Sequence, residues 1–320
     1  MDINVSVPHK MLLSGAYTVL DGSPSLTLAI SPRLHLSIST NLKEKWSDTH
    51  PFIQAVKEIL LDECKTISQK QALFQLFDTR FTTHTAEDPH LWGIGSSAAF
   101  TTAFTLALSE GIALSLTPSK LFEIARNAHR LAQGNKGSGT DIAACTFGGL
   151  VHVSNAHTSQ APNVLSLKWL EDIGIILIQS GQKADTRQLI SLYQDIAKST
   201  RELHNKPLIQ AVENVCHAIT RQKNILEALH QNHLAEIKWT QTLKIPLITT
   251  QHLKLEKQLQ KNFSKQELIL KSLGGGGGDS FGLFYNKKHT PTEKIIQQLT
   301  QLQLPFREIT IEQNGALKKD

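Results

Sequence analysis

Residues 91–100 read LWGIGSSAAF, a short turn with two glycines that passes directly into a helix. The helix, SSAAFTTAFTLALSEG (96–111), is almost wholly apolar, so we predict that it is buried and capped by Ser at its start and by Gly at its end. Gly93 and Gly95 bare their backbone N–H groups at a helix N-terminus, which favours an anion, and a Ser hydroxyl is a ligand for Mg²⁺. The spacing is not that of a Walker A loop, so a plain capped helix after a tight turn is the alternative.

Two further segments have the composition of loops that contact phosphate. In VPHKMLLSGAYTVLDG (7–22), Lys10 follows a proline at the end of a predicted strand, and Gly15 permits close backbone approach. In AHRLAQGNKGSGTDIAACTFGG (128–149), Asp141 follows Gly-Ser-Gly and opens a short apolar helix. An Asp at that place is either an N-cap or a catalytic carboxylate.

Five consecutive glycines, Gly274 to Gly278, lie in SLGGGGGDSFGLF (272–284). By composition such a run is a flexible linker. However, only 42 residues follow Gly278, and they begin at once with an apolar strand that the last domain needs. Glycines at this place allow close backbone approach and positive φ angles, so we predict a loop that faces a ligand.

Composition indicates a globular protein with a real hydrophobic core. The chain has 320 residues, of which 40% are hydrophobic and 19% charged, enough for two domains. The net charge of +5 is mild and suits an acidic small substrate, and with 6% aromatic residues we expect no nucleic-acid partner. The three cysteines lie far apart, with no Cys-x-x-Cys or His-Glu-x-x-His spacing, which argues against a disulfide framework and a structural zinc site. With no apolar leader and no long apolar run, we expect a cytoplasmic protein without a membrane partner.

Hydrophobic periodicity predicts an α+β chain of two domains, 1–163 and 164–320. Short apolar runs over 3–39 indicate strands, and 51–64 and 117–134 indicate amphipathic helices. Strands follow in 164–181, and 186–262, which has no glycine, indicates successive long helices. The remaining elements are a strand at 280–285, a helix at 292–303 and a strand at 306–312.

The order of these segments resembles the GHMP kinase superfamily over essentially the whole chain. The matching motifs are Pro8-x-Lys10 with Gly15-x-Tyr17, then Gly93-x-Gly95-Ser96-Ser97, then Gly-Ser-Gly-x-Asp141, then the late glycine loop. The resemblance implies a two-domain fold, with an N-terminal domain like ribosomal S5 domain 2, which binds ATP, and a ferredoxin-like C-terminal domain. The active site would lie between them.

The resemblance also implies roles for individual residues. ATP would be bound by Gly93, Ile94, Gly95, Ser96, Ser97 and Ala98, with Ser97 as the ligand of Mg²⁺. Lys10 and Asp141 would be catalytic and face the transferring phosphoryl group. The acceptor would be bound by Lys10, Tyr17, Ser138, Gly139, Arg187, Lys271, Gly274, Gly275 and Gly276.

Within the superfamily the chain looks most like the phosphomevalonate kinases. Tyr17, the GSGTDIAA context and Asp279 after the glycines are similar to that family. The implied reaction is ATP-dependent phosphorylation of (R)-5-phosphomevalonate to 5-diphosphomevalonate, in the mevalonate route to isoprenoids, by a monomer or homodimer. A phosphate acceptor is largely dianionic at pH 7 and needs no base, so Asp141 would orient Lys10, and extra cations would matter. Arg130, Lys136, Lys183, Arg187 and Lys271 are the candidates.

Two departures from the family pattern leave alternatives open. Ala16 stands where an acidic residue is usual, and His129 falls near the position of a Mg²⁺-binding Glu. A mevalonate kinase, another GHMP small-molecule kinase or a decarboxylase is therefore a second reading. A catalytically silent binding protein with the same fold is a third.

Overall fold

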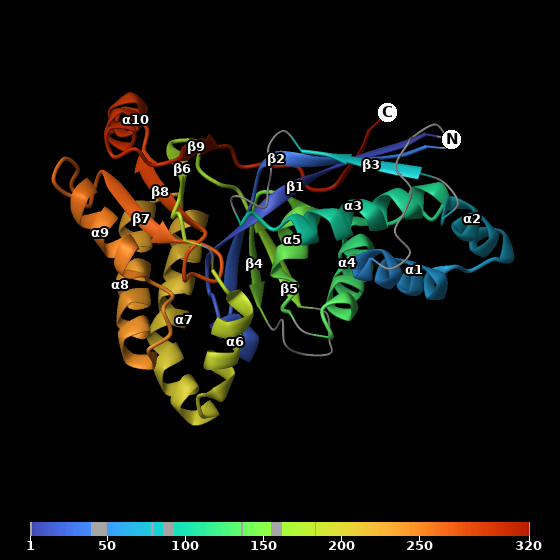
Figure 1. The fold of residues 1–320 in the computed structure, drawn as a ribbon, viewed down its shortest axis with the longest axis horizontal. Helices are drawn as coiled ribbons and strands as arrows, with labels where there is room; N and C mark the ends of the chain where they lie inside the picture. The colour runs from blue at the N-terminus through green and yellow to red at the C-terminus, as the bar shows by residue number, and fades with distance from the viewer. Residues whose placement is uncertain are drawn as a thin grey trace.

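The computed structural model describes residues 2–39, 50–77, 80–85, 93–135, 137–154, 162–182 and 184–319, without the side chains of residues 77, 80, 186 and 187. The chain forms two α+β halves that lie side by side, with the first residues of the described chain and its last strand together on one sheet (Figure 1). Every helix of this described chain is too short or too polar to cross a membrane.

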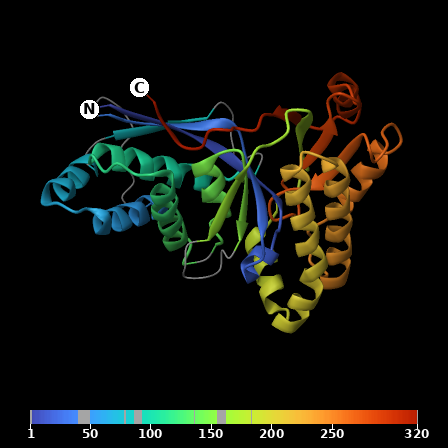
Figure 2. The same cartoon turned by 180° about the vertical axis from the view of Figure 1, so that it is seen from behind.

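The first half is an antiparallel sheet covered on one face by helices (Figures 1 and 2). Its path is β10-β1-β2-β4-β5, and β3 also pairs with β2. The strands are β1 (Ile3–Ser14), β2 (Ser25–Ser39), β3 (Arg80–His84), β4 (Leu150–Ser154), β5 (Asn163–Leu167) and β10 (Leu317–Lys319). The helices are α1 (Pro51–Glu63), α2 (Ile67–Phe77), α3 (Ser96–Gly111), α4 (Pro118–Ala132) and α5 (Thr140–Phe147). The short apolar runs predicted as several strands over 3–39 thus form two long ones, with a 3-10 turn, η1 (Thr18–Asp21), between them.

Helix α3 is the central helix of this half, and most of its side chains are buried, as predicted. The predicted Ser cap is wrong. Gly95, in the left-handed conformation with φ of 76°, is the N-cap and has no side chain to offer. The side chains of Ser96 and Ser97 in the first turn therefore do not cap the helix.

The second half has the ferredoxin-like strand order that the resemblance implied. Its elements are β6 (Ile173–Gln179), α6 (Thr186–Asp195), α7 (Lys198–Thr220), α8 (Ile225–Leu243), α9 (Thr250–Leu259), β7 (Leu268–Ser272), β8 (Ser280–Asn286), α10 (Thr292–Gln301) and β9 (Phe306–Ile309). The sheet order is β7-β8-β6-β9, so β8 is inserted between β6 and β7. This is a split βαβ unit in which α6 to α9 replace a single crossover helix.

The predicted boundary at 163/164 needs correction, because it cuts through β5. Residues 163–167 pair with β4 and so belong to the first sheet. The division falls in the connection to β6, and β10 then returns at the end of the chain to pair with β1. Both crossings tie the halves together.

The two halves also share side-chain contacts. One core cluster joins Leu26, Leu28 and Ile30 of β2 to Val212 and Cys216 of α7. At the turn after β1, the Asp21 carboxylate accepts hydrogen bonds from Tyr193 at 2.5 Å and from Arg201 at 3.1 Å. These contacts fix the relative position of the halves, and with it the shape of the space between them.

Candidate active site

A cavity of about 340 Å³ lies where the predicted phosphate-contacting segments meet. It is lined by residues from β1 and η1, the turn before α3, the end of α4, the start of α5 and the glycine loop between β7 and β8. The polar and glycine lining residues are Lys10, Tyr17, Gly93, Gly95, Ser97, His129, Gln133, Gly137, Ser138, Gly139, Thr140, Asp141, Gly274, Gly275, Asp279 and Ser280. Met11, Leu12, Val19, Leu20, Ile190 and Leu273 form an apolar side.

Lys10 and Asp141 form an ion pair in this cavity, with 2.9 Å between Nζ and Oδ2. The Lys10 side chain is 10% exposed and the Asp141 side chain 36%, so the carboxylate faces the open space more than the ammonium does. Asp141 lies in the first turn of α5, whose N-cap is Gly139. The capping interpretation of Asp141 is therefore wrong, and its carboxylate holds the lysine instead.

The turn before α3 is shaped around that lysine. The Lys10 backbone N–H donates to the Ile94 carbonyl at 3.1 Å, which joins β1 to the turn. Gly93 and Gly95 have positive φ angles, and a Cβ at Gly95 would stand 2.0 Å from Lys10 Cε. Gly93, Gly95 and Ser97 line the cavity, whereas the side chains of Ile94 and Ala98 are buried in the core. Of the residues predicted to bind ATP, every second one, Gly93, Gly95 and Ser97, therefore lines the cavity.

His129 brings the end of α4 to Ser97. Its Nε2 lies 3.3 Å from Ser97 Oγ, and its ring stacks on Phe52 with 5.2 Å between centroids. Burial lowers the pKa of His129, with the nearby Asp141 opposing and Lys10 adding to that shift. A neutral imidazole therefore lies near the position for which the resemblance implies a carboxylate, and it contacts Ser97, the residue predicted to ligate the metal.

The glycine run is a packed loop and not a slack linker, and Gly274 and Gly275 line the cavity. Gly274, Gly276, Gly277 and Gly278 all have positive φ, and a Cβ at Gly276 or Gly278 would lie 2.4 Å from a backbone carbonyl oxygen. The Gly274 N–H donates to the Leu12 carbonyl at 3.0 Å. No atom of the described part of the chain lies within 4 Å of a Cβ built at Gly274, which opens onto the cavity.

Asp279 ends this loop and joins three segments. Its Oδ1 accepts from the Ala184 N–H at 3.1 Å, and its backbone N–H donates to the Gln182 carbonyl at 2.6 Å. Its side chain also lies against Gly93, where a Cβ would come within 3.0 Å. Asp279 therefore holds the glycine loop against both the turn before α3 and the segment that enters α6.

Tyr17 lines the cavity but its hydroxyl is engaged, since it donates to the Gly275 carbonyl. Its ring stacks on Trp239 with 5.6 Å between centroids. Burial raises the pKa of Tyr17. The predicted substrate contact is thus also the residue that fixes the position of the glycine loop.

The structure does not bring all predicted acceptor residues to the cavity. Lys271 is fully buried beneath α8, 2.7 Å from Glu236 and 2.6 Å from Asn232 Oδ1, so its assignment to the substrate phosphate is wrong. Gly276 packs on Leu247 instead of lining the cavity. Arg187 lies in α6, with its side chain outside the described part of the chain, as are Lys136 and Lys183 entirely. Ser138 and Gly139, which the sequence predicts to bind the acceptor, line the cavity.

Arg126 is not among the residues that the sequence predicts for the site, yet it lies beside Gly139. It is 6% exposed, and its side chain fills the space beside Gly139, where a Cβ would come 2.8 Å from its Cδ. Burial lowers the pKa of this guanidinium, and nearby Arg130 adds to the effect. The sequence signal for Arg126 is its position on the apolar, buried face of the amphipathic helix α4.

The donors around the cavity fit a nucleotide with its metal ion. Mg²⁺ takes oxygen ligands and usually keeps waters, with one or two protein oxygens and the phosphates completing its shell. Ser97 Oγ and the half-exposed Asp141 carboxylate are such oxygens. The glycine-bearing turn at the N-terminus of α3 supplies the positive potential that a phosphate chain prefers.

Residues 64–149 match the family model for the GHMP kinases N terminal domain. The chain has the fold of the GHMP kinases, and residues 64–149 are similar to the N-terminal domain of that family. It is 24% identical over 299 residues to the phosphomevalonate kinase of Saccharolobus solfataricus, with 87% of this chain and 88% of that protein covered.

Solved structures agree with the GHMP kinase fold. The phosphomevalonate kinase of Streptococcus pneumoniae, in complex with phosphomevalonate and AMPPNP, superposes with a TM-score of 0.73 at 16% identity, covering 96% of this chain and 99% of that one. The mevalonate kinase of Methanococcus jannaschii superposes with a TM-score of 0.72 at 16% identity, covering 97% and 98%. The GHMP fold thus extends over both halves of this chain.

Proposed function

We propose that this chain is an ATP-dependent phosphotransferase of the mevalonate pathway, and that its acceptor is (R)-5-phosphomevalonate. The observation that carries the proposal is the Lys10–Asp141 ion pair, which opens onto a cavity bordered by three glycine-containing loops. Phosphoryl transfer needs positioning and charge neutralisation more than covalent chemistry, and this arrangement supplies both.

The donor side is assigned to the turn before α3. Gly93, Gly95 and Ser97 would cradle the ATP phosphates, with Ser97 as a metal ligand. Bound Mg²⁺ supplies charge neutralisation to the phosphates. Lys10, held by Asp141 and by the turn itself, would meet the γ-phosphoryl group as its bond to the β-phosphate oxygen breaks.

The acceptor side is assigned to the glycine loop and the start of α5. The acceptor phosphate oxygen forms the new bond to the γ-phosphorus, and ADP leaves with the electron pair of the broken bond. Because a phosphate monoester is largely ionised at pH 7, no proton has to be removed. Asp141 would then act as a positioning residue for Lys10. The similarity to phosphomevalonate kinases supports this choice of acceptor.

One observation favours mevalonate as a second candidate acceptor. Among the described residues that line the cavity, Lys10 is the only lysine or arginine, while Asp141 and Asp279 are both acidic. A second phosphate group would gain from more positive charge than that. Mevalonate brings a hydroxyl, from which the exposed Asp141 carboxylate would take the proton as a general base.

The test is release of ADP from Mg·ATP with mevalonate, phosphomevalonate and diphosphomevalonate offered side by side. We expect turnover with phosphomevalonate and a far lower kcat/KM with the other two. Preference for mevalonate would move the assignment to the second candidate. ATP binding without transfer to any acceptor would instead favour the silent binding protein. A cytoplasmic location and a monomeric or homodimeric state stay predictions.

A further inference from the structure

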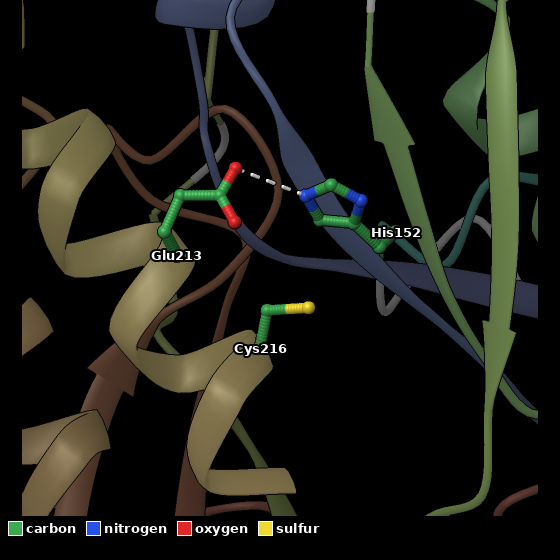
Figure 3. A group of neighbouring side chains, drawn as sticks. All are labelled: His152, Glu213 and Cys216. Carbon is green, nitrogen blue, oxygen red and sulfur yellow. Dashed lines mark hydrogen bonds and ion pairs between the residues drawn. The ribbon is translucent and has the colours of Figure 1, made fainter. Parts of the chain in front are cut away.

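Three side chains with metal-ligating atoms meet between the two halves, away from the described lining of the cavity. His152 comes from β4 of the first sheet, and Glu213 and Cys216 lie one turn apart on α7. Figure 3 shows the Glu213 carboxylate directed at the His152 ring and the Cys216 thiol pointing toward the same space. One helix face and one strand thus present nitrogen, oxygen and sulfur donors to a common point.

The distances are those of a site that needs only small side-chain movements to close. His152 Nε2 lies 3.3 Å from Glu213 Oε1, and the ligand atoms of all three residues lie within 4.8 Å of one another. Zinc bonds of about 2.0–2.3 Å to nitrogen, oxygen and sulfur require ligand atoms within roughly 4 Å of each other. The long Glu213 side chain, which is 33% exposed, has the freedom to make that adjustment.

Charge and access also suit a divalent ion. A glutamate and a thiolate together balance the two positive charges of Zn²⁺, and the neutral imidazole adds none. The thiol proton leaves to solvent as the metal–sulfur bond forms, so no oxidant or reductant is needed. Cys216 is buried, whereas Glu213 lies at the solvent side, which leaves a fourth position for water.

We propose that His152, Glu213 and Cys216 bind a zinc-like divalent ion that cross-links the first sheet to α7. Cys216 belongs to the core cluster that the two halves share. The bound ion would therefore join the halves next to this cluster. The sequence does not predict this site, because His152 and Glu213 are 61 residues apart and the sequence contains no short zinc-binding motif. The proposal does not depend on the identity of the acceptor.

A second cluster of metal-ligating side chains in the described chain would compete for the same ion. His233 of α8 and His252 and Glu256 of α9 also bring their ligand atoms within 4.8 Å of one another. Both histidines are fully buried and their rings stack with 4.9 Å between centroids. This cluster contains no sulfur, so spectroscopy separates the two sites.

The experiment titrates the metal-free full-length protein with Co²⁺ and follows thiolate-to-cobalt charge transfer in the near ultraviolet. We expect about one Co²⁺ per chain with this band, displaced by Zn²⁺. Cys216→Ser should abolish the band, and Cys64→Ser, at another buried free cysteine, should leave it intact. His152→Ala should weaken Co²⁺ binding at least as much as the roughly 10- to 100-fold that loss of an outer-shell partner costs.

Glu213→Gln keeps the shape of a half-exposed side chain and guards against variants that fail to fold. It should weaken Co²⁺ binding while circular dichroism stays unchanged. Zn²⁺ should raise the Tm of the wild-type protein more than that of Glu213→Gln, because binding to the folded state alone is stabilising. Absence of the thiolate band in the wild-type protein, or its survival in Cys216→Ser, overturns the proposal. Equal Zn²⁺ effects on Tm in wild type and Glu213→Gln do so as well.

Discussion

Gly95 leaves space for Lys10: a Cβ on Gly95 would stand 2.0 Å from Lys10 Cε, well inside van der Waals contact. The turn before α3 and the proposed catalytic lysine are therefore shaped for each other. Gly95→Ala would push the ammonium out of its position beside Asp141. We expect a fall in kcat of at least tenfold, because small misplacements of a positioned group have large effects on rate. Steady-state kinetics with saturating Mg·ATP measures it.

The matched control is Gly181→Ala. Gly181 has a φ of 73°, close to the 76° of Gly95, but a Cβ there meets no atom of the described residues within 4 Å. Both variants carry the same left-handed strain, of about 1–2 kcal/mol, and only one carries the clash. If the two lose activity equally, backbone strain and not the lysine explains the loss.

Lys10 and Asp141 should behave as one unit. Lys10→Ala is expected to lower kcat by roughly 10²- to 10³-fold, as removal of one charge-stabilising donor does. Asp141→Asn should also lower kcat, and the double variant should be no worse than the more damaged single variant, since residues that act together are not additive. Multiplying effects in the double variant would mean that the ion pair has no joint role. Circular dichroism of each variant checks the fold.

Lys271 should matter for stability and not for substrate binding. Its ammonium is fully buried and paired with Glu236 at 2.7 Å. Lys271→Ala leaves that carboxylate buried without its partner, so the free energy of unfolding should fall by about 3–5 kcal/mol. Denaturant unfolding measures the loss. The fraction of the Lys271→Ala protein that stays folded should have nearly the wild-type KM for phosphomevalonate. A large rise in KM at unchanged stability would instead show that Lys271 contacts the substrate.

His252 predicts a stability that falls in acid. Burial lowers the pKa of its imidazole from 6.5 to about 3, with His233 and Lys271 adding to the shift. Between these two values the unfolded chain binds a proton that the folded chain does not. Stability from this residue is therefore intact above pH 6.5 and is lost as the pH falls toward 3, at about 1.4 kcal/mol per pH unit.

The measurement is the free energy of unfolding from pH 7 to pH 4 in three proteins. His252→Gln should show a shallower fall with pH than the wild type. His289→Gln removes an exposed histidine and should keep the wild-type slope. A slope in His252→Gln as steep as in the wild type would show that other groups drive the acid loss.

The sequence was most informative at positions where the backbone has a positive φ angle or approaches another segment closely. The helix at 96–111, the late glycine loop and Asp141 in the first turn of α5 were all located from glycines next to apolar runs. Such positions are readable because positive φ angles and close approach leave few residue types to choose from. The ferredoxin-like order of the second sheet came from the resemblance and agrees with the strand pairing.

What the sequence did not reveal is long-range partnership. Lys271 flanks the glycine loop in sequence, yet it faces inward because Glu236 and Asn232, more than thirty residues away, complete its charge and hydrogen bonds. Strand β5 was assigned to the wrong half because its pairing with β4 is a tertiary contact. Local patterns show which residues are special and leave open which residues they meet.

We propose that a phosphoryl group moves from ATP to phosphomevalonate in the cavity of Lys10 and Asp141. The most direct measurement is the ³¹P NMR spectrum of phosphomevalonate incubated with Mg·ATP and the wild-type protein, beside the same mixture with Lys10→Ala. We expect the monoester signal to be replaced by the coupled signals of a diphosphate at the rate at which ADP appears, and Lys10→Ala to slow this conversion strongly. An unchanged monoester signal with the folded wild-type protein would contradict it.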